Sequence, residues 1–219
     1  MTTRLPLTHP AVFVQEIVVA CAEYDPARVR DELDLAAAAL GIGGCIDEVL
    51  FPAMRQIGHL WHCGHLALDA ERLTSEVVRG WLEVLTLRAP EPIDAAPLLL
   101  ACGPADRHSI GLEALGVLLR LQRRRCRVLG GRTSVRALTT AVRANQPSAV
   151  VIASHLKANR ASATLSLRAA AALGPAVFYA GDAFASVRLR RHVPGTHLDT
   201  TVQGACALIL GPPCQVTRD

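Results

Sequence analysis

The stretch that decides the fold is LLLACGPADRHSIGLEALGVLLRL, residues 98–121. It opens on a short, continuous apolar run over residues 98–101, which predicts a buried strand. It closes on apolar side chains that repeat at helical spacing, and we expect a helix over residues 110–123. A polar loop that contains Asp106 and His108 separates the two. A strand followed by a loop and a helix is the repeating unit of α/β proteins.

The same alternation of short apolar runs and helical segments continues along the chain. Strands that alternate with helices imply a parallel sheet covered on both faces. In such folds ligands bind outside the carboxyl ends of the strands. We therefore predict a flavodoxin-like, Rossmann-type parallel-sheet domain over residues 93–219. Its further strands are expected at residues 127–129, 149–153, 176–179 and, as a short edge, 195–198, and its further helices at 135–144, 163–173, 183–191 and 201–210.

Before about residue 90 the pattern is helical throughout. Asp25 precedes Pro26, which places a capping side chain before a proline suited to a first helical turn. A glycine-rich break at residues 41–44 and Gly64 separate later helical segments. We predict an N-terminal four-helix bundle over residues 1–92. Its helices are expected at about residues 10–21, 26–40, 46–60 and 68–87.

The composition is typical of a folded globular protein. The 219 residues are 51% hydrophobic and 19% charged, with a formal net charge of +4, which argues against disorder. No apolar run approaches the roughly 18 residues that a membrane span needs, and the N-terminus lacks the pattern of a secretory signal. The seven cysteines form no CxxC pair, so we expect reduced thiols and a cytoplasmic protein.

Two further clusters have less specific patterns. A group of potential zinc ligands lies within seven residues, but its spacing fits no usual zinc site. Residues 123–127 contain four arginines at the end of a predicted helix, where cations complement the helix dipole. We favour that interpretation of the arginines over nucleic-acid binding. The potential zinc ligands are His59, His62, Cys63 and His65.

Three loops that follow predicted strands carry short motifs. Each motif alone is weak, but their order at the ends of the first, third and fourth strands resembles the cobalamin-binding domain family. That family includes methionine synthase, corrinoid methyl carriers and light-sensing regulators of the CarH type. Ala180 stands where the family often has glycine. The motifs are DxHxxG (Asp106, His108 and Gly111), SxL (Ser154 and Leu156) and a small residue before glycine (Ala180 and Gly181).

The resemblance implies a cobalamin cofactor and a role for each motif residue. His108 is expected to be the lower cobalt ligand in place of the cofactor's own base. Asp106 can accept a hydrogen bond from the other imidazole nitrogen, which fixes the tautomer and raises ligand basicity. Gly111 and Gly181 are expected to leave space for the nucleotide tail, beside which Ser154 supplies a hydroxyl.

A second resemblance lies in the helical half. Trp61 and Glu71 form a W-x9-E pattern, which is similar to the W-x9-EH pattern of CarH-type photoreceptors. The resemblance implies that the bundle covers the upper corrin face and that these two residues surround the upper axial group. His62 is then the expected cobalt ligand after light removes that group. Arg72 stands where the pattern has histidine; it suits a carboxylate such as a bilin propionate, or a solvated helix face.

Together these resemblances predict a stand-alone photosensor with no catalytic residues. Its cofactor is expected to be adenosylcobalamin, with biliverdin as the option for a second chromophore, as in the photocobilins. About nine residues precede the first helix, so we expect no direct DNA binding, and a signal that passes to an unidentified protein partner or through a homo-oligomer. The alternatives are a corrinoid methyl carrier of a methyltransferase system and a cobalamin-binding antirepressor.

Overall fold

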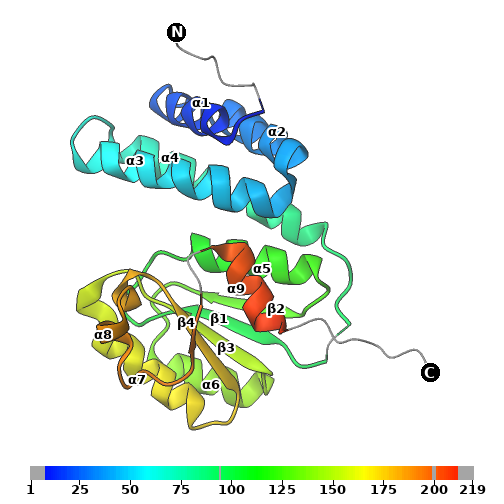
Figure 1. Cartoon of the computed structure of the whole chain (residues 1–219), viewed down its shortest axis with the longest axis vertical. Helices are drawn as coiled ribbons and strands as arrows, with labels where there is room; N and C mark the ends of the chain where they lie inside the picture. Colours follow the sequence, from blue (N-terminus) through cyan, green and yellow to red (C-terminus); the bar gives the residue numbers. More distant parts are fainter. Residues whose placement is uncertain (1–7, 94, 199–200, 212–219) are drawn as a thin grey trace. The chain divides into compact units, whose positions relative to one another are not determined.

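The computed structural model describes residues 8–93, 95–198 and 201–211. The chain divides into two compact units, Met1–Leu87 and Arg88–Asp219, here named the helical unit and the sheet unit. The described part of the first is built from helices alone, and the second contains a five-stranded parallel sheet (Figure 1). The predicted fold class, a helical bundle with a flavodoxin-like domain, is confirmed.

The helical unit is a bundle in which α1 contacts α2, α3 and α4, and α2 contacts α4. Its core is aliphatic, with Ile17, Leu33 and Ile57 buried. Trp81 is also buried, and its indole N–H donates to Asp34 at 2.8 Å. The elements are α1 (Pro10–Ala22), α2 (Pro26–Gly44), a π-helix (Cys45–Leu50), α3 (Phe51–His62) and α4 (Leu68–Leu87).

The predicted glycine-rich break falls inside α2 and is local. Gly41 has a φ of 73°, which ends the regular helix, but helical turns resume at once and lead through the π-helix into α3. Pro26–His62 is consequently long and apolar enough to pass for a membrane span by length and composition. One such stretch is weak evidence for a membrane span, because core helices of soluble proteins pass the same test, and Leu33 and Ile57, near its two ends, are buried in the bundle.

The sheet has the strand order β2-β1-β3-β4-β5 with every neighbouring pair parallel. This is the flavodoxin-like order: β2 lies on one side of β1, and β3, β4 and β5 follow in turn on the other side. Every residue of β1 and β3 is buried, as expected for central strands covered on both faces. The strands are β1 (Leu98–Cys102), β2 (Cys126–Gly130), β3 (Ala149–Ala153), β4 (Ala176–Ala180) and β5 (Thr196–His197).

Helices cover both faces of this sheet. On one face α5 (Ile110–Leu121) contacts α9 (Val202–Leu210), and on the other α6 (Val135–Asn145) contacts α7 (Arg160–Ala171) (Figure 1). The helix expected over residues 183–191 is instead a 3₁₀ turn (Asp182–Phe184) followed by the short α8 (Val187–Arg190). The division has a local cause, because Ser186 is extended and caps α8 by accepting the N–H of Leu189.

Candidate functional site

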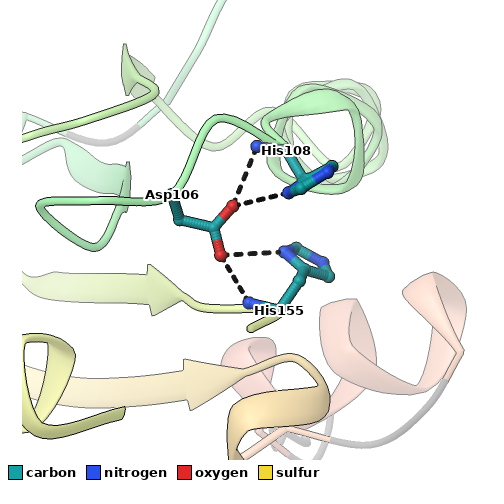
Figure 2. A group of neighbouring side chains, drawn as sticks. All are labelled: Asp106, His108 and His155. Carbon is teal, nitrogen blue, oxygen red and sulfur yellow. Dashed lines mark hydrogen bonds and ion pairs between the residues drawn. The ribbon is translucent and has the colours of Figure 1, made fainter. Parts of the chain in front are cut away.

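The carboxyl ends of β1 and β3 bring together an aspartate and two histidines. The two strands pair in parallel with Cys102 opposite Ala153, so the loops that follow them leave the sheet side by side. The β1 loop supplies Asp106 and His108, and the β3 loop supplies His155. Figure 2 shows the Asp106 carboxylate between the two imidazole rings. Among the described residues, this is the only group of three potential metal-ligating side chains whose ligand atoms lie within 4.8 Å of one another.

Each carboxylate oxygen of Asp106 serves one histidine. Oδ1 accepts the backbone N–H of His108 at 2.9 Å and lies 2.8 Å from that residue's ring Nδ1. Oδ2 accepts the backbone N–H of His155 and lies 3.5 Å from its ring Nδ1. Both contacts to the rings are drawn in Figure 2. The side chain of Asp106 is completely buried, so these four contacts replace its hydration.

The surroundings keep Asp106 ionised. Burial alone would raise the pKa of its carboxyl group, but the hydrogen bonds from the rings and backbone N–H groups of His108 and His155 outweigh burial and lower it. An ionised carboxylate accepts only, so the short contact to His108 requires a proton on Nδ1. In the neutral ring the lone pair is then on Nε2, the nitrogen that would bind a metal. In this geometry the carboxylate orients the imidazole ring and fixes its tautomer, as carboxylates do for metal-binding histidines.

The β2 loop supports the backbone of this site. The main-chain carbonyl of Asp106 accepts the N–H of Arg132 at 2.6 Å. Gly131 lies so close that a Cβ there would be 3.2 Å from the Cα of Arg107. The main-chain N–H of Asp106 donates to Gly103 at 3.0 Å, which closes the β1 loop on itself. The sequence did not indicate this contribution, because neither Gly131 nor Arg132 belongs to a recognisable motif.

Ser154 and Gly181 form the neighbouring part of the site, between β3 and β4. The N–H of Ser154 donates to the carbonyl of Ala180 at 3.0 Å. A Cβ on Gly181, whose φ is 98°, would lie 2.2 Å from the carbonyl oxygen of Ser154. Glycine is therefore needed here by the packing of the chain itself, in addition to any space that a ligand requires. The Ser154 hydroxyl is buried and has no hydrogen-bond partner within the described structure.

Two other predicted residues flank these loops. Gly111 lies in the first turn of α5, three residues after His108. Leu156 follows His155 directly and leaves about half of its side chain exposed. His155 itself was not among the predicted site residues, because it occupies the variable position of the SxL motif. Its place at the end of β3, the strand beside β1, was the signal that could have found it.

The residues of the W-x9-E pattern lie where α3 ends and α4 begins. Trp61 and His62 occupy the last turn of α3, and Glu71 and Arg72 the first part of α4. Glu71 accepts the hydroxyl of Ser75 at 3.0 Å, one helical turn further on. In the described part of the chain, no hydrogen bond joins Trp61, His62 and Glu71 to one another. The structure therefore brings these residues to one end of the bundle without linking them.

A tight turn ends α3, and the last residues of the helix are exposed. The N–H of Gly64 donates to the carbonyl of Trp61 at 2.9 Å, and that of His65 to Leu60 at 2.8 Å. With φ of 75° at Gly64, this is a Schellman ending that stops the helix. Trp61 remains 44% exposed, whereas Trp81 is 2% exposed. Trp61 is thus not an ordinary core aromatic residue.

The potential zinc cluster is not assembled in the described structure. The thiol of Cys63 lies 3.7 Å from Nε2 of His59, one turn earlier on α3. These two exposed residues acquire no third ligand within reach among the described residues.

Comparison with known proteins finds one family model, one curated relative and a solved structure that are similar to this chain. Residues 14–86 match the family model described as B12 binding domain. The chain is 37% identical over 150 residues to the HTH-type transcriptional repressor CarH of Myxococcus xanthus, an alignment that covers 65% of this chain and 47% of CarH. The chain thus spans about half the length of that relative.

The fold is also that of a solved corrinoid protein. The monomethylamine corrinoid protein of Methanosarcina barkeri superimposes with a TM-score of 0.73 at 14% identity, covering 90% of this chain and 97% of the other. At that identity the likeness concerns the fold alone. Residues 14–86 of the helical unit are thus similar to B12 binding domains, and the chain is similar in sequence to part of the CarH repressor.

Proposed function

We propose that the protein binds cobalamin with His108 as the lower cobalt ligand and acts as a light sensor. The observation that carries the proposal is the 2.8 Å contact between the His108 ring and the buried Asp106 carboxylate. A carboxylate on Nδ1 orients the ring and raises the basicity of Nε2, the usual arrangement behind a metal-bound histidine. The match of residues 14–86 to the B12 binding domain family supports the same cofactor.

The residues near His108 fit a cofactor with a polar tail. The buried hydroxyl of Ser154 lacks a partner among the described residues, and such a group is costly unless a ligand or water completes its hydrogen bonding. Ser154 follows β3 directly, at the edge of the sheet where ligands of this fold class bind. His108 would therefore hold the metal and Ser154 would accept or donate one hydrogen bond to the tail.

The helical unit supplies the second part of the proposal. Trp61 presents an exposed indole, and a large exposed aromatic side chain is suited to cover an apolar ligand group. When bound, adenosylcobalamin supplies a cobalt–carbon bond that light can break. The contribution of this chain is to enclose the upper group with Trp61 and Glu71. His62 then offers an imidazole as replacement ligand.

The signal would pass onward through a change between two arrangements of the protein. Exchange of the upper ligand for His62 would bias such a two-state element. An unidentified protein partner or a homo-oligomer would receive the signal. Arg72 is exposed, so its guanidinium is accessible to the propionate of a bilin, and biliverdin is the second chromophore to include in the tests.

The test is spectroscopic. The protein is incubated with hydroxo-, methyl- and adenosylcobalamin, with and without biliverdin, and absorption is recorded in the dark and after green light. We expect bound adenosylcobalamin that changes to a bis-histidine spectrum on illumination. Bound cobalt that ignores light but accepts and returns methyl groups would instead identify a methyl carrier. A protein that binds no form of cobalamin would overturn the proposal.

A substitution tests the assigned ligand. His108→Ala should give a base-off spectrum and weaker binding, because the lower imidazole is lost. His59→Ala is the matched control, since this exposed histidine has no part in the proposal, and it should bind as the parent does. A base-on spectrum in the His108→Ala variant would contradict the assignment.

A further inference from the structure

His155 shares the buried carboxylate with His108 but belongs to none of the motifs that predict the site. Its backbone N–H donates to Oδ2 of Asp106, and its ring Nδ1 lies 3.5 Å from the same oxygen. That Nδ1 is buried and makes no hydrogen bond within the described residues, so the 3.5 Å approach to Oδ2 is an ion-pair contact and not a hydrogen bond. The two imidazoles meet edge to face, with ring centroids 5.5 Å apart. Figure 2 shows that both rings point toward the carboxylate.

A buried carboxylate has two oxygens, and both need partners. If only Oδ1 were held, the group could rotate about its terminal torsion, which is a broad and soft one. Rotation would lengthen the contact between Oδ1 and the His108 ring. The backbone N–H of His155 holds Oδ2 by a hydrogen bond, and the His155 ring adds a 3.5 Å contact to the same oxygen; both oppose that rotation from the other side. The orientation of His108 thus depends on a residue of a different loop, 49 positions further along the chain.

The two histidines differ in accessibility. The side chain of His108 is 63% exposed and that of His155 is 34% exposed. A large planar ligand can therefore reach His108 more readily. The less accessible ring is the one with the longer contact to the carboxylate. These differences assign ligation to His108 and support of the carboxylate to His155.

We propose that His155 is a positioning residue of the cobalamin site, which holds the Asp106 carboxylate so that Oδ1 stays on Nδ1 of His108. The inference rests on the proposed function for the identity of the metal. The positioning itself concerns only this chain's own residues. It is therefore measurable in the protein without any cofactor.

The test compares three variants. His155→Ala removes the ring, His155→Phe keeps a ring but no donor, and His155→Asn restores a donor at nearly the same place. Lys157→Ala is the matched control, an exposed residue in the same loop. The first readout is the tautomer of His108, measured by ¹⁵N NMR in the cofactor-free protein. The second is the affinity for methylcobalamin and the base-on fraction in its absorption spectrum.

We expect the alanine and phenylalanine variants to lose the single Nδ1–H tautomer of His108 and to bind methylcobalamin about tenfold more weakly, as is usual when the support of a metal ligand is removed. The asparagine variant and the Lys157 control should resemble the parent. An unchanged tautomer in both ring-loss variants would overturn the proposal. So would a complete base-off spectrum with the His108 tautomer intact, because His155 would then be the ligand itself. Failure of the parent to bind cobalamin would overturn the proposed function alone, since the tautomer measurement still tests the positioning.

Discussion

The two units carry their motifs in different ways. In the sheet unit, loops that follow β1 and β3 converge on one buried carboxylate, and both oxygens of that carboxylate accept hydrogen bonds from the chain. In the helical unit, Trp61 and Glu71 lie at the ends of successive helices, and Trp61 is 44% exposed. The first set of residues is fixed by strand register. The second set lies on the surface, where core packing does not require particular side chains.

The difference has an energetic consequence. Residues that complete buried hydrogen bonds stabilise both the fold and the binding of a ligand, because an unsatisfied buried polar group is costly. Exposed residues contribute little to folding and can be altered at small cost. Substitutions in the sheet motifs should therefore change both stability and binding. Those in the W-x9-E pattern should change only properties that involve the ligand.

The largest effect on stability is expected at Trp81, and Trp61 in the same unit provides the contrast. Trp81→Ala should lower the free energy of unfolding by about 3–5 kcal/mol, because the ring is buried and its N–H donates to Asp34. Trp61→Ala should cost less than about 1 kcal/mol, as is usual for exposed positions. Urea unfolding followed by circular dichroism measures both. Equal losses would mean that Trp61 is a core residue and would remove the contrast between the units.

A smaller effect is expected at the glycine between β3 and β4. Gly181→Ala combines a positive φ with a clash against the Ser154 carbonyl, and we expect a loss of about 3 kcal/mol or more. Gly174→Ala is the matched control, because its φ is 100° but no atom lies within 4 Å of an added Cβ. It should cost only the backbone strain, about 1–2 kcal/mol. If the two variants unfold alike, close packing against Ser154 is not what requires Gly181.

The next effect concerns the charge of Asp106. Asp106→Asn keeps the shape but removes the ionised acceptor, and we expect a loss of about 1.5–3 kcal/mol near neutral pH. The folded-state pKa is lowered, so this stabilisation is complete above the unfolded-state pKa of about 4 and is lost as the pH falls toward the folded-state value. The gap in stability between parent and variant should therefore narrow in acid. A gap that stays constant down to pH 2 would show that the charge contributes nothing.

The sequence predicted the strands well where burial was continuous. Both the first and the last residue of β3 (Ala149–Ala153) were predicted correctly, because an apolar run between polar turns defines a central strand. The helix over residues 183–191 was misjudged, since the cap at Ser186 outweighs the helical pattern around it. Asp106 and His108 were found through a motif on one loop. His155 and Gly131 were not, because their roles arise only when β1 lies between β2 and β3.

The smallest effect on stability, and the most specific effect on light response, is expected at His62. The side chain is exposed, so His62→Ala should leave unfolding unchanged within about 0.5 kcal/mol. Binding of adenosylcobalamin in the dark should also persist, because the proposed lower ligand is His108. The spectrum after green light should differ from that of the parent, since the replacement ligand is missing. His65→Ala, an exposed histidine beyond the end of α3, is the control.

Identical illuminated spectra for the His62→Ala variant and the parent would remove His62 from the mechanism and leave it as a surface residue. A variant that also loses binding in the dark would contradict the contrast between the units, because an exposed residue of the bundle would then hold the cofactor before light acts. The expected result separates the two roles. Under the proposed function, the sheet unit would bind through a preformed pair, the buried Asp106 and the exposed His108, and the helical unit would respond through side chains that folding leaves accessible.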